Sequence, residues 1–236
     1  MIRFAFFDRD GTLLYRDPSL SAQINARVRE WTGGDFSAPC DIDALFAEAG
    51  YPDAFFLRNR ENEDACIREE RAFWVRFYAL RLKKLGCAEF VEARAKALHE
   101  MTWLKGLIPY PDAVQTLEHF RARGVRMGVI SDTSPSLRLT LKISGLSDYF
   151  ESATCSAFAG CMKPDPRIYR QALSAMGARA EESLYVDDYE PESDGARAIG
   201  MTAFHIARHS GVHLDDPWSI RSLLEMIEWY DENSKG

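Results

Sequence analysis

Two aspartates stand one residue apart at the end of an apolar stretch near the start of the chain. The apolar residues Phe4–Phe7 predict a short buried strand, and Asp8 and Asp10 follow it directly. Because alternate residues of an extended segment point the same way, both carboxylates are expected to project toward one site. Gly11 then lets the chain turn sharply away. Two acids this close repel each other unless a cation lies between them or they perform different tasks.

An Asp-x-Asp-Gly-Thr stretch on its own is also compatible with a plain polar turn after a strand. Three later stretches favour a shared site instead. Ser131 ends another predicted strand, Asp187 and Asp188 follow a third, and Lys163 comes just before a predicted helix. In an open α/β sheet, ligands bind at the carboxyl ends of the strands, so these groups are expected to gather at one edge.

The chemistry that suits this set of groups is phosphoryl transfer. Carboxylate oxygens of Asp8 and Asp188, with the backbone carbonyl oxygen of Asp10, suit Mg²⁺, which uses few protein ligands. A carboxylate can attack phosphorus to form an aspartyl-phosphate. A second carboxylate can protonate the leaving oxygen and later activate water. Ser131 and Lys163 can hold the phosphoryl oxygens.

The elements that must position these residues fall into two kinds. Residues 16–104 show only helical patterns, which end at Gly or Pro signals and predict helices over 21–31, 41–49, 62–85 and 89–101. After residue 109 strands alternate with helices. Strands are predicted over 125–130, within 149–156, and over 183–186 and 201–206, and helices over 112–123, 136–144, 166–176, 193–199 and 219–230.

This alternation predicts an α/β fold with a parallel sheet. The first strand precedes the helical block and the other strands follow it. We therefore expect a doubly wound, Rossmann-like catalytic core made of residues 1–15 and 105–236, with an all-helical domain inserted at residues 16–104.

Composition narrows the class of protein. The chain has 236 residues, of which 46% are hydrophobic and 28% charged, as in soluble globular proteins. No apolar run approaches the roughly 20 residues of a membrane span, and no signal peptide is evident. The net charge of −7 argues against a nucleic-acid partner. The five scattered cysteines predict reduced thiols and a cytoplasmic location.

Together these motifs resemble those of the haloacid dehalogenase-like hydrolase superfamily, in its helical-cap subfamily. The first motif is Asp8–Thr12 and the second is the strand end at Ser131. The third is Lys163–Tyr169, and the fourth is Val186–Asp188 with Gly195–Met201 downstream. The helical insertion has the position and character of that subfamily's cap but does not match it residue by residue.

The resemblance implies a role for each matched residue. Asp8 would be the nucleophile and Asp10 the general acid/base, while Ser131 and Lys163 would bind the phosphoryl group. Asp10 also favours a phosphatase over the haloacid dehalogenases, which resemble this chain but lack an acid at that position.

The fourth motif has two adjacent acids where Gly-Asp is frequent. Asp187 or Asp188 would complete the Mg²⁺ site, with Asp188 favoured as the direct ligand and Asp187 behind it. The further acid that is often found downstream could be Glu192 or Asp194, and the spacing leaves both open.

Three further features depart from the pattern or lie outside it. Asp132 stands where Asn is common, and we expect it to point away or to order its loop. Arg9 occupies a usually apolar position, and alternation should turn it away from the nucleophile. The insertion carries arginines that could bind an anionic substrate tail or form a solvated, ion-paired face, namely Arg58, Arg60, Arg68, Arg71 and Arg76.

The function that this pattern favours is Mg²⁺-dependent hydrolysis of a small phosphorylated metabolite through an aspartyl-phosphate. Two alternatives stay open: a phosphomutase that uses the same site, and a binding domain that kept the fold and lost the chemistry. Intact Asp8, Asp10 and Lys163 argue against the second alternative. The identity of the substrate and the oligomeric state are left open by the sequence.

Overall fold

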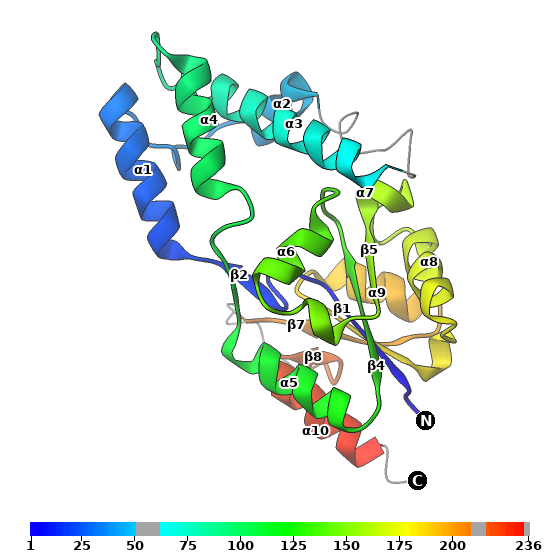
Figure 1. Cartoon of the computed structure of the whole chain (residues 1–236). Coiled ribbons are helices and arrows are strands. Elements are labelled where there is room, and N and C mark those ends of the chain that lie inside the picture. Colours follow the sequence, from blue (N-terminus) through cyan, green and yellow to red (C-terminus); the bar gives the residue numbers. More distant parts are fainter. Residues whose placement is uncertain (51–61, 209–215, 234–236) are drawn as a thin grey trace. The chain divides into compact units, whose positions relative to one another are not determined.

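The computed structural model describes residues 1–50, 62–208 and 216–233 (Figure 1). The chain divides into two compact units, which we describe separately. The first comprises Met1–Tyr15, Ile108–Thr133 and Leu137–Gly236. The second comprises Arg16–Leu107 together with the short segment Ser134–Ser136.

A six-stranded sheet forms the centre of the first unit. Its order is β5-β4-β1-β6-β7-β8, and neighbouring strands pair in parallel. The strands are β1 (Phe4–Phe7), β4 (Arg126–Ser131), β5 (Ser152–Cys155), β6 (Ser183–Asp187), β7 (Thr202–Ile206) and β8 (Ser219–Ile220). The helices are α5 (Pro111–Ala122), α6 (Leu137–Ile143), α7 (Ser156–Ala159), α8 (Pro166–Met176), α9 (Glu190–Ala198) and α10 (Leu223–Asn233). The predicted α/β fold is confirmed.

Strand β1 lies in the middle of the sheet because its residues are apolar on both faces. On one face Phe6 belongs to a buried cluster with Tyr169 of α8 and Tyr185 of β6. On the other face the ring of Phe7 lies 6.2 Å from that of Phe120 in α5, which in turn contacts Tyr230 of α10. A strand that is buried on both faces reads as a continuous apolar run, which is what Phe4–Phe7 shows.

The register of the sheet brings the strand ends together. Phe7 pairs with Val129 of β4 and with Val186 of β6, and the N–H of Asp8 donates to the carbonyl oxygen of Val186 at 2.9 Å. The polar residues that follow these strands therefore emerge side by side at one edge of the sheet.

The second unit is built from helices α1 (Pro18–Thr32), α2 (Ile42–Ala49), α3 (Glu63–Lys84) and α4 (Val91–Thr102). The first three helices are capped at their starts by the side chains of Asp17, Asp41 and Asn62, and Gly33 and Gly50 end the first two in left-handed conformations. Aromatic rings from α2 and α3 pack together in its core, including Phe46, Phe73, Trp74 and Phe77. The four helices predicted between residues 16 and 104 are all present.

The structure differs from the predicted elements at several places, including the start of helix α1, which begins at Pro18 instead of residue 21. Residues 219–220 form strand β8 instead of the start of the last helix, which begins at Leu223 because Glu225 accepts the N–H groups of Arg221 and Ser222. Helix α9 begins at Glu190, three residues earlier than predicted, with a proline in its first turn. Strands β2 (Leu14–Arg16) and β3 (Leu107–Pro109) form a separate two-stranded sheet that was not predicted.

None of the helices in the described part of the chain combines the length and the apolar character needed to cross a membrane.

Candidate active site

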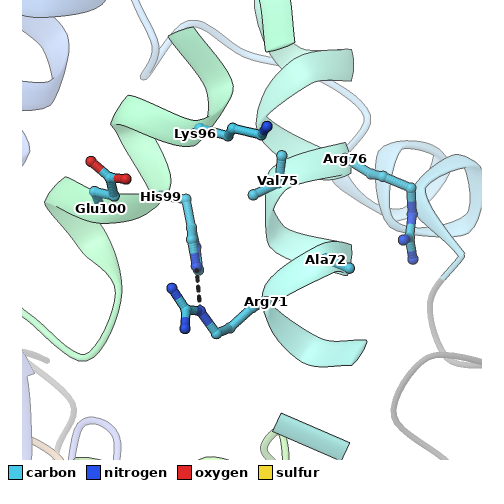
Figure 2. A pocket seen from close by; sticks show the side chains of 7 residues that line it. All are labelled: Arg71, Ala72, Val75, Arg76, Lys96, His99 and Glu100. Carbon is cyan, nitrogen blue, oxygen red and sulfur yellow. Dashed lines mark hydrogen bonds between the residues drawn. The ribbon is translucent and has the colours of Figure 1, made fainter. Parts of the chain in front are cut away.

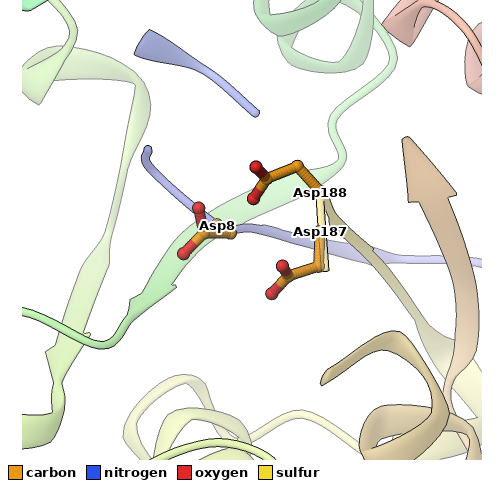
Figure 3. A group of neighbouring side chains, drawn as sticks. All are labelled: Asp8, Asp187 and Asp188. Atoms are coloured by element: carbon orange, nitrogen blue, oxygen red, sulfur yellow. The ribbon is translucent and has the colours of Figure 1, made fainter. Parts of the chain in front are cut away.

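Three carboxyl groups converge at the carboxyl edge of the sheet (Figure 3). Asp8 follows β1, Asp187 ends β6 and Asp188 comes directly after it. One carboxylate oxygen from each lies within 4.8 Å of the others. Asp8 and Asp187 are only 5% and 1% exposed, so these two acids are held away from bulk water, whereas Asp188 is exposed.

Gly11 makes room for the third acid. It has a φ of 77°, in the left-handed region, and a Cβ atom added there would lie 2.0 Å from Oδ2 of Asp188. Any side chain at position 11 would therefore collide with the Asp188 carboxylate. The glycine of the first motif thus serves both the turn and the position of an acid from the fourth motif.

Lys163 is the cation at the centre of this cluster. Its Nζ atom lies 2.8 Å from Oδ1 of Asp8, 2.7 Å from Oδ2 of Asp187 and 2.5 Å from Oε2 of Glu192. It also donates to the hydroxyl oxygen of Tyr185 at 3.2 Å. The lysine is 7% exposed, so one buried ammonium is shared among three carboxyl groups.

The charges of the site are poorly balanced without a further cation. Burial raises the pKa of Asp8 well above its usual value, and Asp187 adds to this while Lys163 opposes it. Burial and Asp187 also raise the pKa of Asp188. Burial alone would lower the pKa of Lys163, but the neighbouring acids and Tyr185 raise it well above its usual value. The excess of carboxylate oxygens is a donor set that fits a hard divalent cation.

Asp187 and Asp188 differ in how their oxygens are used. Oδ2 of Asp187 accepts hydrogen bonds from Lys163 and from the hydroxyl of Tyr185, and Oδ1 accepts from the N–H of Tyr189. These contacts fix Asp187 as a partner of the lysine and occupy both of its oxygens. Among the described residues, the carboxylate of Asp188 shows no contact with Lys163 or Tyr185, and this residue is exposed where Asp187 is buried.

The carboxylate of Asp10 lies outside the group of three. Its side chain is 53% exposed and is paired with the buried guanidinium of Arg9, whose side chain is 9% exposed. Asp10 still lies near enough to raise the pKa of Asp8, behind the larger effect of burial. The structure therefore brings Asp8, Asp187 and Asp188 together and keeps the fourth acid beside them.

The second and third motifs are linked by Asp132. Ser131, the last residue of β4, is 1% exposed. Both oxygens of the next residue, Asp132, accept the backbone N–H of Lys163, at 3.1 and 3.0 Å. The extra carboxylate thus orders the loop that carries the lysine.

Two residues of the cluster were not assigned from the sequence. Tyr185 stands two residues before Asp187 in the same strand, so alternation could have placed it on the same face. Glu192 was left open against Asp194. In the structure the carboxylate of Glu192 forms an ion pair with Lys163, whereas Asp194 pairs with Arg197 at the surface.

The helical unit has a pocket of its own, of about 470 Å³, between α3 and α4 (Figure 2). Its lining is Arg71, Ala72, Val75, Arg76, Lys96, His99 and Glu100. Nε of Arg71 donates to Nε2 of His99 at 3.4 Å. No ion pair involves Arg71, Arg76 or Lys96 in the part of the chain that the structure describes. Arg58 and Arg60 lie outside that part.

Several known proteins are similar to this chain in sequence. A glyceraldehyde 3-phosphate phosphatase from Methanopyrus kandleri is 30% identical over 213 residues, which cover 88% of this chain and 85% of the relative. A phosphoserine phosphatase from Thermus thermophilus is 37% identical over 111 residues, but this match covers only 46% of the chain and 43% of that protein.

Among solved structures, a HAD phosphatase from Thermococcus onnurineus superposes with a TM-score of 0.62 at 23% identity. That superposition covers 97% of both chains and supports the fold. A family model described as haloacid dehalogenase-like hydrolase matches residues 2–200, a range that contains every residue of the acidic cluster and Lys163. This chain therefore belongs to the haloacid dehalogenase-like hydrolase family, as its four motifs predicted.

Proposed function

We propose that this hydrolase is a Mg²⁺-dependent phosphatase that cleaves a small phosphorylated metabolite through an aspartyl-phosphate on Asp8. The observation that carries the proposal is the ion pair between the buried ammonium of Lys163 and Oδ1 of Asp8. It lies beside an acidic cluster that fits a divalent cation. The relatives named as phosphatases support phosphate esters as the substrate class.

The proposed reaction has two steps. A carboxylate oxygen of Asp8 attacks phosphorus, the bond to the ester oxygen breaks, and the leaving oxygen takes a proton from Asp10. Asp10 then accepts a proton from water, which attacks the phosphoryl group and releases phosphate, so Asp8 is regenerated. Lys163 and Ser131 would bind the phosphoryl oxygens as charge develops on them.

The cation would be held by the carboxylates of Asp8 and Asp188 and by the carbonyl oxygen of Asp10. Mg²⁺ there would offset the repulsion between an anionic nucleophile and an anionic ester. Asp187 would support the cation site without contacting the cation directly, because both of its oxygens accept hydrogen bonds from Lys163, Tyr185 and a backbone N–H. We further propose that the inserted helical unit is the cap that selects the substrate.

The proposal is tested by measuring phosphate release from a panel of small phosphate esters, with and without Mg²⁺. Wild type should release phosphate only with Mg²⁺, and Asp8→Asn should lose the activity while keeping its fold by circular dichroism. Asp148→Asn, at an exposed position of the same unit, is the matched control and should behave as wild type. An active Asp8→Asn protein would refute the mechanism, and an isomerised sugar phosphate in place of free phosphate would indicate a mutase.

A further inference from the structure

Arg9, which separates the two aspartates of the first motif, is a buried cation with a two-point contact to one of them. Its Nε donates to Oδ1 of Asp10 at 3.0 Å, and its Nη2 donates to Oδ2 at 2.5 Å. A guanidinium that meets a carboxylate in this forked way fixes the orientation of the acid as well as its charge.

The same guanidinium has a second anchor in the loop after β4. Nη2 of Arg9 also donates to Oγ1 of Thr133 at 2.9 Å. Thr133 is itself held, because its N–H donates to Oγ of Ser156 at 3.0 Å. The arginine is 7% exposed, and its guanidinium contacts both Asp10 and Thr133. These contacts restrict the rotamer of the Asp10 side chain.

This arrangement has a consequence for the acidic cluster. Asp10 is only two residues from Asp8, yet its carboxylate is not among the three that gather around the candidate cation site. We propose that Arg9 is a positioning residue that holds the Asp10 carboxylate away from the cation and oriented for proton transfer. The inference rests on the proposed function, since it explains how the Asp10 carboxylate stays apart from the three acids that gather around the candidate cation site.

The test is Arg9→Met, which keeps an unbranched, flexible side chain and removes its charge and fork. Mg²⁺ binding is measured by calorimetry without substrate, and kcat and KM are measured separately. The freed, uncompensated carboxylate of Asp10 should tighten Mg²⁺ binding by about tenfold. Loss of orientation should lower kcat by about 10- to 100-fold, with little change in KM. This is less than the roughly 100- to 10,000-fold contribution of general acid/base catalysis, because Asp10 itself is still present.

Three further variants keep the inference falsifiable if Arg9→Met folds poorly. Arg9→Lys keeps the charge without the fork and should bind Mg²⁺ as wild type does, with an intermediate kcat. Arg9→Met with Asp10→Asn should lose the gain in Mg²⁺ affinity. Thr133→Val removes only the second anchor and should lower kcat less than Arg9→Met does.

Unchanged Mg²⁺ affinity and unchanged kcat in Arg9→Met would overturn the inference, as would a gain in affinity that persists in the double variant. These outcomes presuppose an active, Mg²⁺-binding wild type. A wild type that neither binds Mg²⁺ nor releases phosphate would instead refute the proposed function, so the two failures are distinguishable.

Discussion

At the scale of single residues, Lys163 determines how the acids of the site are arranged. Its ammonium lies within 2.8 Å of carboxylate oxygens of Asp8, Asp187 and Glu192. Removing the partner of a buried ion pair costs more than the pair contributes, because the remaining charge has no compensation. Burial raises the pKa of Asp8, and Lys163 opposes this effect and so favours the ionised carboxylate, which is the state that a nucleophile needs.

Glu192 gives this arrangement a measurable pH dependence in the metal-free protein. Burial, with Asp187 adding to it and Lys163 opposing it, raises the pKa of Glu192 from its usual 4.5 to about 7. A raised pKa in the folded state means that the stabilising effect of the proton is complete below pH 4.5 and is lost as pH rises through 7. Wild type should thus lose stability relative to Glu192→Gln across that window.

Urea denaturation at a series of pH values measures this difference. Glu190→Gln, at an exposed position of the same helix, is the control and should parallel wild type. A constant difference between wild type and Glu192→Gln from pH 4.5 to 7 would contradict the prediction.

The residues of the site that could be predicted from the sequence are those that follow strands. The general rule that ligands bind at the carboxyl ends of parallel strands predicts that Asp8 and Asp188 lie close together, and both belong to the acidic cluster of the structure. The contact of Arg9 with Asp10 and Thr133 could not be predicted, because it joins positions 124 residues apart. Alternation indicates which way a side chain leaves the strand but not which partner it reaches.

At the scale of elements, helix α3 holds a distant loop through one buried acid. Glu70 is 1% exposed, and it accepts hydrogen bonds from the hydroxyl of Ser134 at 2.5 Å and from the N–H and hydroxyl of Ser136 at 2.8 and 2.7 Å. This explains why Ser134–Ser136 groups with the helical unit although its neighbours in sequence do not.

Glu70→Ala should lower the free energy of unfolding by about 2–3 kcal/mol, because it leaves buried donors without an acceptor. Glu69→Ala is the matched control, since Glu69 is the exposed neighbour in the same helix, and its effect should stay within about 0.5 kcal/mol. Both values come from denaturant titration at one pH. Equal losses in the two variants would show that the contacts of Glu70 contribute no specific stability.

The elements that could be predicted are those with a strong pattern and clear end signals. Helix α8 spans Pro166–Met176 as predicted, with a proline at its start and Gly177 at its end. The two-residue strand β8 could not be separated from the following helix, because Ile220 fits the apolar spacing of that helix. Strands β2 and β3 have three residues each, too few to show a period.

At the scale of the whole molecule, all residues proposed for the chemistry belong to one unit. Asp8, Asp10, Ser131, Lys163 and Asp188 lie in the first unit, and none lies in the helical one. The helical unit begins and ends at neighbouring points, since the N–H of Asp17 donates to the carbonyl oxygen of Gly106 at 2.7 Å. A two-residue turn can therefore replace residues 18–105 without stretching the chain.

The shortened protein, of about 150 residues, is within the size of an independent domain. It should bind Mg²⁺ in calorimetry with wild-type affinity, because the acidic cluster is intact, and it should still release phosphate from p-nitrophenyl phosphate. If the helical unit selects the substrate, the spread of kcat/KM across the ester panel should narrow. Adding Asp8→Asn to the shortened protein should remove its activity.

Two outcomes would contradict the prediction. A folded, shortened protein that keeps the full spread of kcat/KM would assign selectivity to the α/β unit. One that no longer binds Mg²⁺ would place part of the cation site in the helices.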